Sequence, residues 1–179
     1  NGQITAPAGQ VVLAAGDIFS AALSLDDKAV KVIGGIGSVT QNGIINADGT
    51  TGDGGNVTLT AGQEVVLAEN SLTSANAGTN GDGGQVIAYS PGKTVFDNGA
   101  RIEAKGGSLS GNGGFAEISG GEFVFAGDID LTANNGAGGK LLLDPLYLTI
   151  ADGSGTATVN TIYEQTVENL SVSGVDVIY

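Results

Sequence analysis

Residues 83–88 of the chain read Gly-Gly-Gln-Val-Ile-Ala, and related hexapeptides that also begin with two glycines stand at residues 54–59, 113–118 and 138–143. The second glycines of the four copies follow one another at intervals of 29, 30 and 25 residues. In each copy the fourth and sixth positions are apolar, which is the alternation of a strand with one buried face. The sequence therefore predicts that the same strand returns about once every 29 residues.

Two further short segments return within each repeat. The first is predicted as a second strand at residues 65–68, 94–97 and 123–126, with residues 11–14 as an earlier copy. The second has the form Ile/Leu-x-Ala and is found at residues 4–6, 45–47, 102–104 and 131–133, with residues 72–74 as a degenerate copy. The connecting segments are rich in Gly, Asn and Asp, which tolerate positive φ, so they predict turns. Three strands per repeat predict a triangular cross-section.

Short strands with frequent turns could also build an antiparallel sandwich or barrel. Such a sheet needs no fixed repeat length, whereas equivalent apolar positions recur here one whole repeat later, as they must when each turn stacks on the one before. Residues 1–150 are therefore predicted to form an all-β fold, a right-handed parallel β-helix (solenoid) with three short strands per turn of about 29 residues.

Residues 151–179 depart from the repeat and are predicted as a helix and a strand that cap or continue the solenoid. Apolar residues between Val159 and Leu170 follow i, i+3 and i+4 spacings, which indicates one short amphipathic helix of roughly 12 residues. We expect this helix to pack on the side or the end of the solenoid, and a partner-binding helix is the alternative. Residues 174–179 (Gly-Val-Asp-Val-Ile-Tyr) then resume a strand.

The composition excludes several classes of function. The 179 residues include 19 acidic and 6 basic side chains, and the resulting net charge of −13 would repel a nucleic-acid backbone. Cys and His are absent, and with them the thiolate and imidazole ligands of zinc, haem and iron–sulfur sites and the His-dependent catalytic triads. Carboxylate and carbonyl chemistry remains.

Asp53 and Asp82 are the metal candidates of this sequence. They recur one repeat apart beside paired glycines, and stacked carboxylates with backbone carbonyls are ligands that Ca²⁺ takes. The alternative, which we prefer, is a solvated turn in which each Asp bonds to its own backbone. No other metal or cofactor is expected.

A second group of carboxylates is a candidate for catalysis. Asp128 and Asp130 lie two residues apart on one face of a predicted strand, and Glu103 and Glu117 are further members. Parallel β-helices include polysaccharide lyases and hydrolases that use such groups. Two basic residues that could neutralise an acidic sugar are close in sequence: Arg101 and Lys105. We expect a solubilising acidic face and no catalytic residue, and a carboxylate-based, polysaccharide-active enzyme is the alternative.

Three phenylalanines fall within eleven residues, and they divide between two environments. Phe123 and Phe125 share one face of a predicted strand, whereas Phe115 occupies a position whose counterparts in other repeats are polar. Phe115 is expected to cover a flanking loop or the helix, and exposed hydrophobic recognition is the alternative.

Longer motifs resemble one family of bacterial proteins. The first are residues 1–6 (Asn-Gly-Gln-Ile-Thr-Ala) and 9–14 (Gly-Gln-Val-Val-Leu-Ala). Residues 113–120 (Gly-Gly-Phe-Ala-Glu-Ile-Ser-Gly) and the junction at 142–150, in which Leu-Leu-Asp-Pro is followed by Leu-Thr-Ile, are more discriminating. Together they look like the secreted exoproteins of two-partner secretion, the filamentous-haemagglutinin and high-molecular-weight adhesin group. The resemblance covers nearly the whole chain, but the family's amino-terminal secretion domain with its Asn-Pro-Asn motifs is not visible.

The resemblance implies a large exoprotein, secreted or held at the bacterial cell surface, that extends as a rod and acts in cell adhesion, aggregation or biofilm formation. Its implied partners are glycans or proteins of host or neighbouring cells. An outer-membrane transporter would act through a part of the parent protein outside this chain. We expect a structural and adhesive role and no enzyme activity. The alternative is a self-assembling extracellular filament whose subunits stack end to end through open strand edges.

Overall fold

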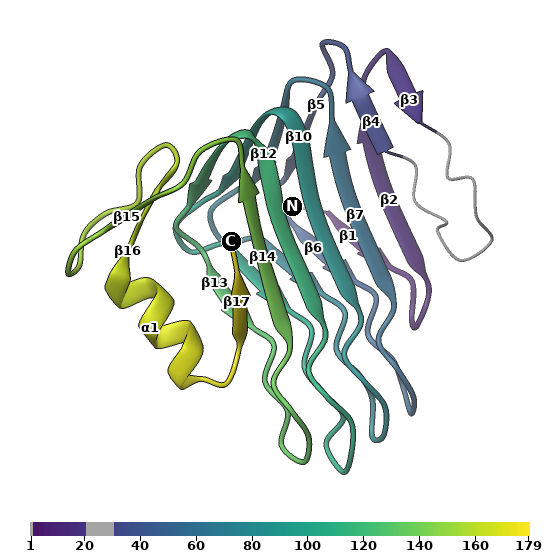
Figure 1. The fold of residues 1–179 in the computed structure, drawn as a ribbon. Coiled ribbons are helices and arrows are strands. Elements are labelled where there is room, and N and C mark those ends of the chain that lie inside the picture. The colour runs from purple at the N-terminus through teal and green to yellow at the C-terminus, as the bar shows by residue number, and fades with distance from the viewer. Residues whose placement is uncertain (1, 21–30) are drawn as a thin grey trace.

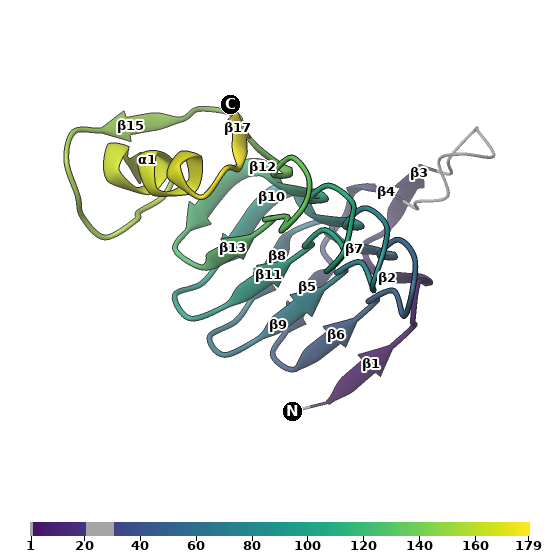
Figure 2. The ribbon, with the colours of Figure 1, turned by 90° about the horizontal axis from the view of Figure 1, so that it is seen from below.

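The chain forms a parallel β-solenoid followed by one short helix (Figure 1). The computed structural model describes residues 2–20 and 31–179. The turns stack along one axis, with the first strand at one end and the helix at the other (Figure 2). The predicted parallel β-helix with one short C-terminal helix is confirmed.

Most strands belong to two parallel sheets. The first has the order β1 (Gln3–Thr5), β6 (Ile44–Asn46), β9 (Leu72–Ser74), β11 (Arg101–Glu103) and β13 (Asp128–Asp130). The second has the order β17 (Asp176–Ile178), β14 (Lys140–Pro145), β12 (Phe115–Phe125), β10 (Gln85–Phe96), β7 (Asn56–Ala61) and β2 (Gln10–Ala15). In the same sheet, the second half of β10 pairs with β8 (Glu64–Leu67), which pairs with β5 (Ser38–Gln41). Two small pairs stand outside: antiparallel β3 (Ile18–Ser20) with β4 (Lys31–Gly34), and parallel β15 (Thr149–Ala151) with β16 (Thr161–Tyr163).

Equivalent positions of the repeat stack directly on one another. Val86 pairs with Val57 in the preceding turn and with Ala116 in the following turn, and Ala116 pairs with Leu141. All four side chains are fully buried. One repeat is therefore one turn, and the apolar alternation seen in the sequence forms a continuous column inside the solenoid.

Two of the corners are bends within a strand. β10 and β12 each turn a corner of the solenoid, from the segment after the Gly-Gly pair to the segment predicted as a second strand. The register between β10 and β12 shifts at this corner, between Ser90 and Lys93. The strands predicted separately at residues 85–88 and 94–97 are therefore parts of one strand. The Thr94 hydroxyl donates a hydrogen bond of 2.7 Å to the Ser119 carbonyl across this bend, so a buried polar side chain links the two turns.

The predicted alignment of residues 11–14 is wrong. These residues lie in β2, which pairs with β7 and not with β8, and the second-strand position of that turn belongs to β5. The register is fixed by Gly9, whose carbonyl accepts the Asn56 N–H at 2.9 Å, as Gly55 accepts the Gln85 N–H in the next turn. Residues 11–14 and 65–68 have the same sequence, Val-Val-Leu-Ala, but occupy different faces.

Two predicted copies of the third strand are also displaced. Thr73 and Ile129 pair with Ile102, whereas the predicted copies placed Leu72 and Leu131 there. The Ile-x-Ala pattern misled the alignment because a threonine replaces the isoleucine in one turn and Leu131 replaces the alanine in another. At this position Ile45, Thr73 and Ile102 are buried and Ile129 is half-buried, whereas Ile4 of the first turn is exposed.

The paired glycines allow adjacent turns to approach one another closely. A Cβ atom on Gly84 would lie 1.9 Å from the Gly55 carbonyl oxygen, and one on Gly114 would lie 2.1 Å from the Gly84 carbonyl oxygen. Both obstacles are backbone atoms, which cannot move aside as a flexible side chain could. The recurrent Gly-Gly pair is therefore a steric requirement of the stacking.

Aromatic rings fill the core near the C-terminal end. The rings of Phe96 and Phe125 meet edge to face with centroids 5.5 Å apart, and Phe123 is fully buried. The prediction that Phe123 and Phe125 share a face is confirmed, because both point into the core. Phe115 lies half-buried on the outside of β12.

The C-terminal helix α1 (Glu164–Val172) is shorter than predicted and begins later. Residues 161–163 form β16, and Asn160 before it has a φ of 52°, which a right-handed helix does not contain. Val167 and Leu170 pack against the core, so the expectation that the helix packs on the solenoid is confirmed. The strand predicted at residues 174–179 is β17, which pairs with β14. Within the described residues, no helix is long and apolar enough to cross a membrane.

The glycine stacking predicts opposite outcomes for two alanine substitutions. Gly84→Ala should lower the free energy of unfolding by about 3 kcal/mol or more, because its Cβ meets a backbone carbonyl. Gly52→Ala, whose Cβ meets nothing within 4 Å, should change it by less than about 0.5 kcal/mol. Urea denaturation followed by circular dichroism measures both, and equal stabilities for the two variants would contradict the stacking argument.

A second pair of substitutions tests the buried threonines. The hydroxyl of Thr73 is buried without a hydrogen-bond partner, so Thr73→Val should stabilise the fold by about 1 kcal/mol. Thr94→Val removes the bond to the Ser119 carbonyl and should destabilise the fold by about 1 kcal/mol or more. Thermal unfolding of the two variants should shift the midpoint in opposite directions, and a destabilised Thr73→Val would refute the assignment of an unsatisfied hydroxyl.

Candidate functional site

Asp53 and Asp82 lie at equivalent positions of successive turns, as predicted. Each accepts a backbone hydrogen bond from the turn that follows. The Asp82 N–H donates to Asp53 Oδ1 at 2.8 Å, and the Asn112 N–H donates to Asp82 Oδ1 at 2.7 Å. Asn112 continues the series, because its Oδ1 accepts the Ala137 N–H at 3.0 Å. We call these three side chains the corner ladder. We expected each Asp to bond to its own backbone, whereas the bonds shown come from the backbone of the following turn.

The corner ladder offers a Ca²⁺ ion few ligands. One oxygen of each carboxylate already accepts a backbone N–H, which leaves the second oxygens of Asp53 and Asp82 one turn apart. Ca²⁺ takes about six to eight oxygen ligands, so most would have to come from water. In the described parts of the chain, no three carboxylates gather where they could hold a metal ion. A Ca²⁺ site at Asp53 and Asp82 stays the alternative that we do not prefer, and it is untested.

A groove of about 680 Å³ runs beside the corner ladder across four turns. Asp53, Asp82, Asn112, Phe115 and Lys140 are among the residues that line it. Phe115 stands in register between Gln85 and Lys140 on the outer face of the second sheet. The groove therefore combines carboxylate and amide groups with one aromatic side chain, a mixture that suits polar ligands with an apolar face.

Four charged side chains form a compact cluster on the first sheet. Glu103 accepts a hydrogen bond of 2.6 Å from Arg101 Nε and lies 2.8 Å from Lys105 Nζ. Arg101 Nη2 also reaches Asp130 Oδ2 in the following turn at 3.4 Å. Asn76 of the preceding turn donates to Glu103 Oε2 at 3.0 Å. The cluster thus connects three successive turns by charge-assisted bonds.

The charge of Glu103 is strongly favoured. Burial raises its pKa, but hydrogen bonds from Lys105, Arg101 and Asn76 outweigh burial and hold the pKa at about 2. The hydrogen bond to Glu103 raises the pKa of Arg101 above its usual value. A general acid needs a pKa raised towards the working pH, so this environment does not prepare Glu103 for that role.

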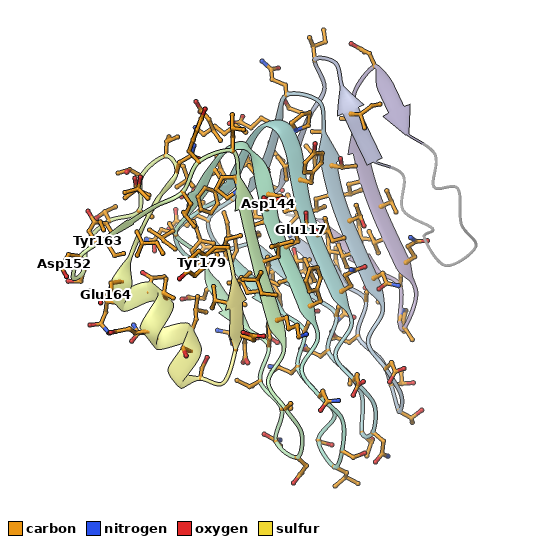
Figure 3. The ribbon with its side chains drawn as sticks, in the orientation of Figure 1. Glu117, Asp144, Asp152, Tyr163, Glu164 and Tyr179 are labelled. Atoms are coloured by element: carbon orange, nitrogen blue, oxygen red, sulfur yellow. The ribbon has the colours of Figure 1, made fainter. Side chains whose placement is uncertain are left out.

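Only some of the carboxylate side chains that were considered as catalytic candidates lie close together in the structure. Asp130 joins Glu103, and Asp128 stands in register with Arg101. Glu117 lies on β12 in the second sheet, where Figure 3 shows it beside Asp144 on the same face. Glu117 accepts a hydrogen bond from the Ser119 hydroxyl and takes no part in the cluster.

Sequence reasoning missed several residues of these surfaces. Asn112 precedes a Gly-Gly pair as Asp53 and Asp82 do, so the sequence held the signal that would have added it. Asp48 and Asn76 form a second series, in which Asp48 Oδ1 accepts the Asn76 N–H at 2.7 Å and Asn76 Oδ1 accepts the Lys105 N–H at 2.9 Å. Their spacing of 28 and 29 residues matches the repeat, but nothing local distinguishes them from other turn residues.

A scan against protein-family models, a search of curated proteins and a search of solved structures found no match to this chain.

The Glu103 cluster predicts a pH-dependent effect of one substitution. Glu103→Gln should lower the free energy of unfolding at pH 7 by about 1 kcal/mol, because it removes charge-assisted bonds from a largely buried carboxylate. The folded-state pKa lies below the ordinary value of 4.5, so the stabilisation is complete above pH 4.5 and is lost as the pH falls towards 2. The stability difference between wild type and variant should shrink over that interval.

Chemical denaturation at a series of pH values between 7 and 2 measures this difference. Glu69→Gln, which changes an exposed carboxylate in the turn before β9, serves as the matched control and should show a much smaller effect. A Glu103→Gln deficit that stayed constant down to pH 2 would show that the carboxylate charge is not what stabilises the cluster.

Proposed function

We propose that this chain is a structural and adhesive segment of a large bacterial exoprotein, secreted or held at the cell surface and similar to filamentous haemagglutinin. Its role is cell adhesion, aggregation or biofilm formation, and it is not catalytic. The motifs at residues 113–120 and 142–150 support the family, and the parallel stacking of turns supports the role. A solenoid of stacked turns presents an extended surface, which suits an adhesive role.

The observation that carries this proposal is the direct stacking of outward side chains. Asn56, Gln85, Phe115 and Lys140 stand in register on the second sheet, one per turn, beside the corner ladder. Such an array can make the same kind of contact several times along one ligand or cell surface, and repeated weak contacts raise the overall affinity. Glycans or proteins of neighbouring or host cells are the proposed partners. Nucleic acid is not, given the net charge of −13.

A bead adhesion assay tests the proposed role. Beads coated with the chain should bind bacterial or epithelial cells several-fold more than beads coated with an inert carrier protein, and soluble chain should compete. Gly52→Ala should bind like wild type and Gly84→Ala should lose binding, because only the second disturbs the stacking. Coated beads that bind no more than the inert carrier to any cell type, and do not clump, would refute the adhesive role.

A filament subunit is the second candidate, because the two edges of the second sheet share one register. In β17, Asp176 pairs with Lys140, and in β2, Gln10 pairs with Asn56, which is the equivalent position. End-to-end stacking would therefore place Val177 next to Val11 inside one continuous column. Sedimentation that shifts to larger species with concentration, together with fibres in electron micrographs, would favour the filament, and a monomer at all concentrations would exclude it.

A further inference from the structure

The groove beside the corner ladder has a lining that repeats from turn to turn. In each of four successive turns it is lined by a corner residue, by glycine and by the first residue of the strand that follows. These strands are β7, β10, β12 and β14, which lie side by side (Figure 1). Neighbouring strands of a sheet lie about 4.8 Å apart, so the lining repeats at that interval along the solenoid axis. The groove therefore suits an extended ligand whose own units recur at a similar distance.

The glycine backbone that lines the groove is already hydrogen-bonded within the solenoid. The N–H groups of Gly83 and Gly113 donate to carbonyls at 2.9 Å, and those of Gly84 and Gly114 donate to carbonyls at 2.7 Å. The carbonyls of Gly84 and Gly114 accept the first N–H of the next strand at 2.9 Å. Because these six groups are paired, an extended peptide could not add as a strand along the glycines. A ligand of the groove has to bind through side chains.

The side chains of the groove keep polar atoms that the protein does not use. Those of Asn56 and Gln85 have no hydrogen-bond partner among residues 2–20 and 31–179. Asp82 and Asn112 each use one side-chain oxygen to accept an N–H of the following turn, which leaves a carboxylate oxygen and an amide nitrogen. Amide groups both donate and accept, as the hydroxyl groups of a sugar do. The groove therefore offers mixed donors and acceptors in three successive turns.

Phe115 places an apolar surface among these polar groups. It is half-buried and stands in register between Gln85 and Lys140, at a position that is polar in the other turns of the groove. The face of an aromatic ring is negative, and the C–H groups on one face of a pyranose are weakly positive, so the two surfaces attract. The hydroxyl groups at the rim of the same sugar can then bond to neighbouring side chains. One aromatic ring flanked by amides and carboxylates is a combination that suits a carbohydrate.

Charge decides between neutral and acidic carbohydrates. Asp53 and Asp82 contribute two carboxylates to the lining, against the single ammonium group of Lys140. The whole chain carries a net charge of −13. Both the groove and the molecule therefore repel uronic acids and sulfated sugars.

We infer that the groove binds a neutral polysaccharide in an extended conformation, of the class of β-1,4-linked hexoses, with one sugar ring per turn. Pyranose rings joined through equatorial bonds recur at nearly the spacing of stacked strands, so successive rings meet equivalent positions of successive turns. One ring packs on Phe115, and its neighbours bond to the amides of Gln85 and Asn112. The inference rests on the proposed adhesive function and names the class of glycan.

A titration of the isotope-labelled full chain with cellohexaose, a hexamer of β-1,4-linked glucose, tests the inference. We expect saturable shifts of the Gly84, Gly114 and Phe115 amides in the millimolar range, because a shallow groove makes few contacts. Maltohexaose, the α-1,4-linked hexamer, coils and should bind about tenfold more weakly or not at all. The β-1,4-linked hexamer of glucuronic acid should show the same loss through its charge. Absent shifts with cellohexaose, or equal binding by either control, would overturn the inference.

Two matched pairs of variants test the assigned side chains. Phe115→Leu keeps an apolar side chain but removes the ring, and should weaken cellohexaose binding about tenfold, whereas Phe115→Trp should bind as wild type does or more tightly. Gln85→Ala removes an amide from the groove and should weaken binding about threefold. Gln63→Ala removes an exposed amide outside the groove and should leave binding unchanged. Circular dichroism verifies that each variant is folded, and equal effects within either pair would overturn the assigned site.

The bead adhesion assay separates this inference from the proposed function. If the groove is the adhesive contact, cellohexaose should compete with cells and Phe115→Leu beads should bind several-fold fewer cells than wild-type beads. Wild-type beads that bind cells, combined with absent cellohexaose shifts, would overturn the glycan groove and leave the adhesive role standing. Specific cellohexaose shifts, combined with beads that bind no cells, would support the groove and refute the adhesive role.

Discussion

The close stacking of paired glycines is the constraint on which the rest of the structure depends. Gly55, Gly84 and Gly114 place their backbones so near one another that a single methyl group would collide with a carbonyl of the adjacent turn. Because the glycines let adjacent turns lie this close, the N–H groups of Gln85, Phe115 and Lys140 donate to carbonyls of the preceding turn at 2.9 to 3.0 Å. The register of every following strand is then set, because each turn begins from the same corner.

Direct stacking also determines the polar surface. A side chain in one turn meets its counterpart in the next, so Asp53, Asp82 and Asn112 can each accept a backbone N–H from the turn that follows. The same geometry brings Glu103 within reach of Asn76 in the preceding turn, and its neighbours Arg101 and Lys105 hold it ionised. Stacking at the glycine corners repeats the outward side-chain positions as well as the buried ones. The proposed adhesive role depends on this repetitive outer surface.

The sequence predicted features that depend on local pattern and missed those that depend on contacts between distant segments. Apolar alternation after each Gly-Gly pair identified the strands correctly, since burial of one face is visible residue by residue. The identical segments at 11–14 and 65–68 could not be separated, because their faces are decided by which glycine stacks below them. The helix was predicted from Val159 onward, since spacing does not report the left-handed backbone of Asn160. The sequence identified Asp53 and Asp82 as a recurring pair. Their role as acceptors of backbone N–H groups could not be predicted, because the donors belong to the following turn.

Nuclear Overhauser contacts between turns test the central claim most directly. Parallel stacking predicts contacts from the Gln85 amide to the Gly55 and Asn56 backbone, and from the Phe115 amide to the Gly84 and Gln85 backbone, at intervals of one repeat. An antiparallel sandwich would instead show close Hα–Hα contacts between strands adjacent in sequence, such as β7 and β8. Contacts of the first kind would confirm glycine-dependent stacking of parallel turns, and contacts of the second kind would contradict it.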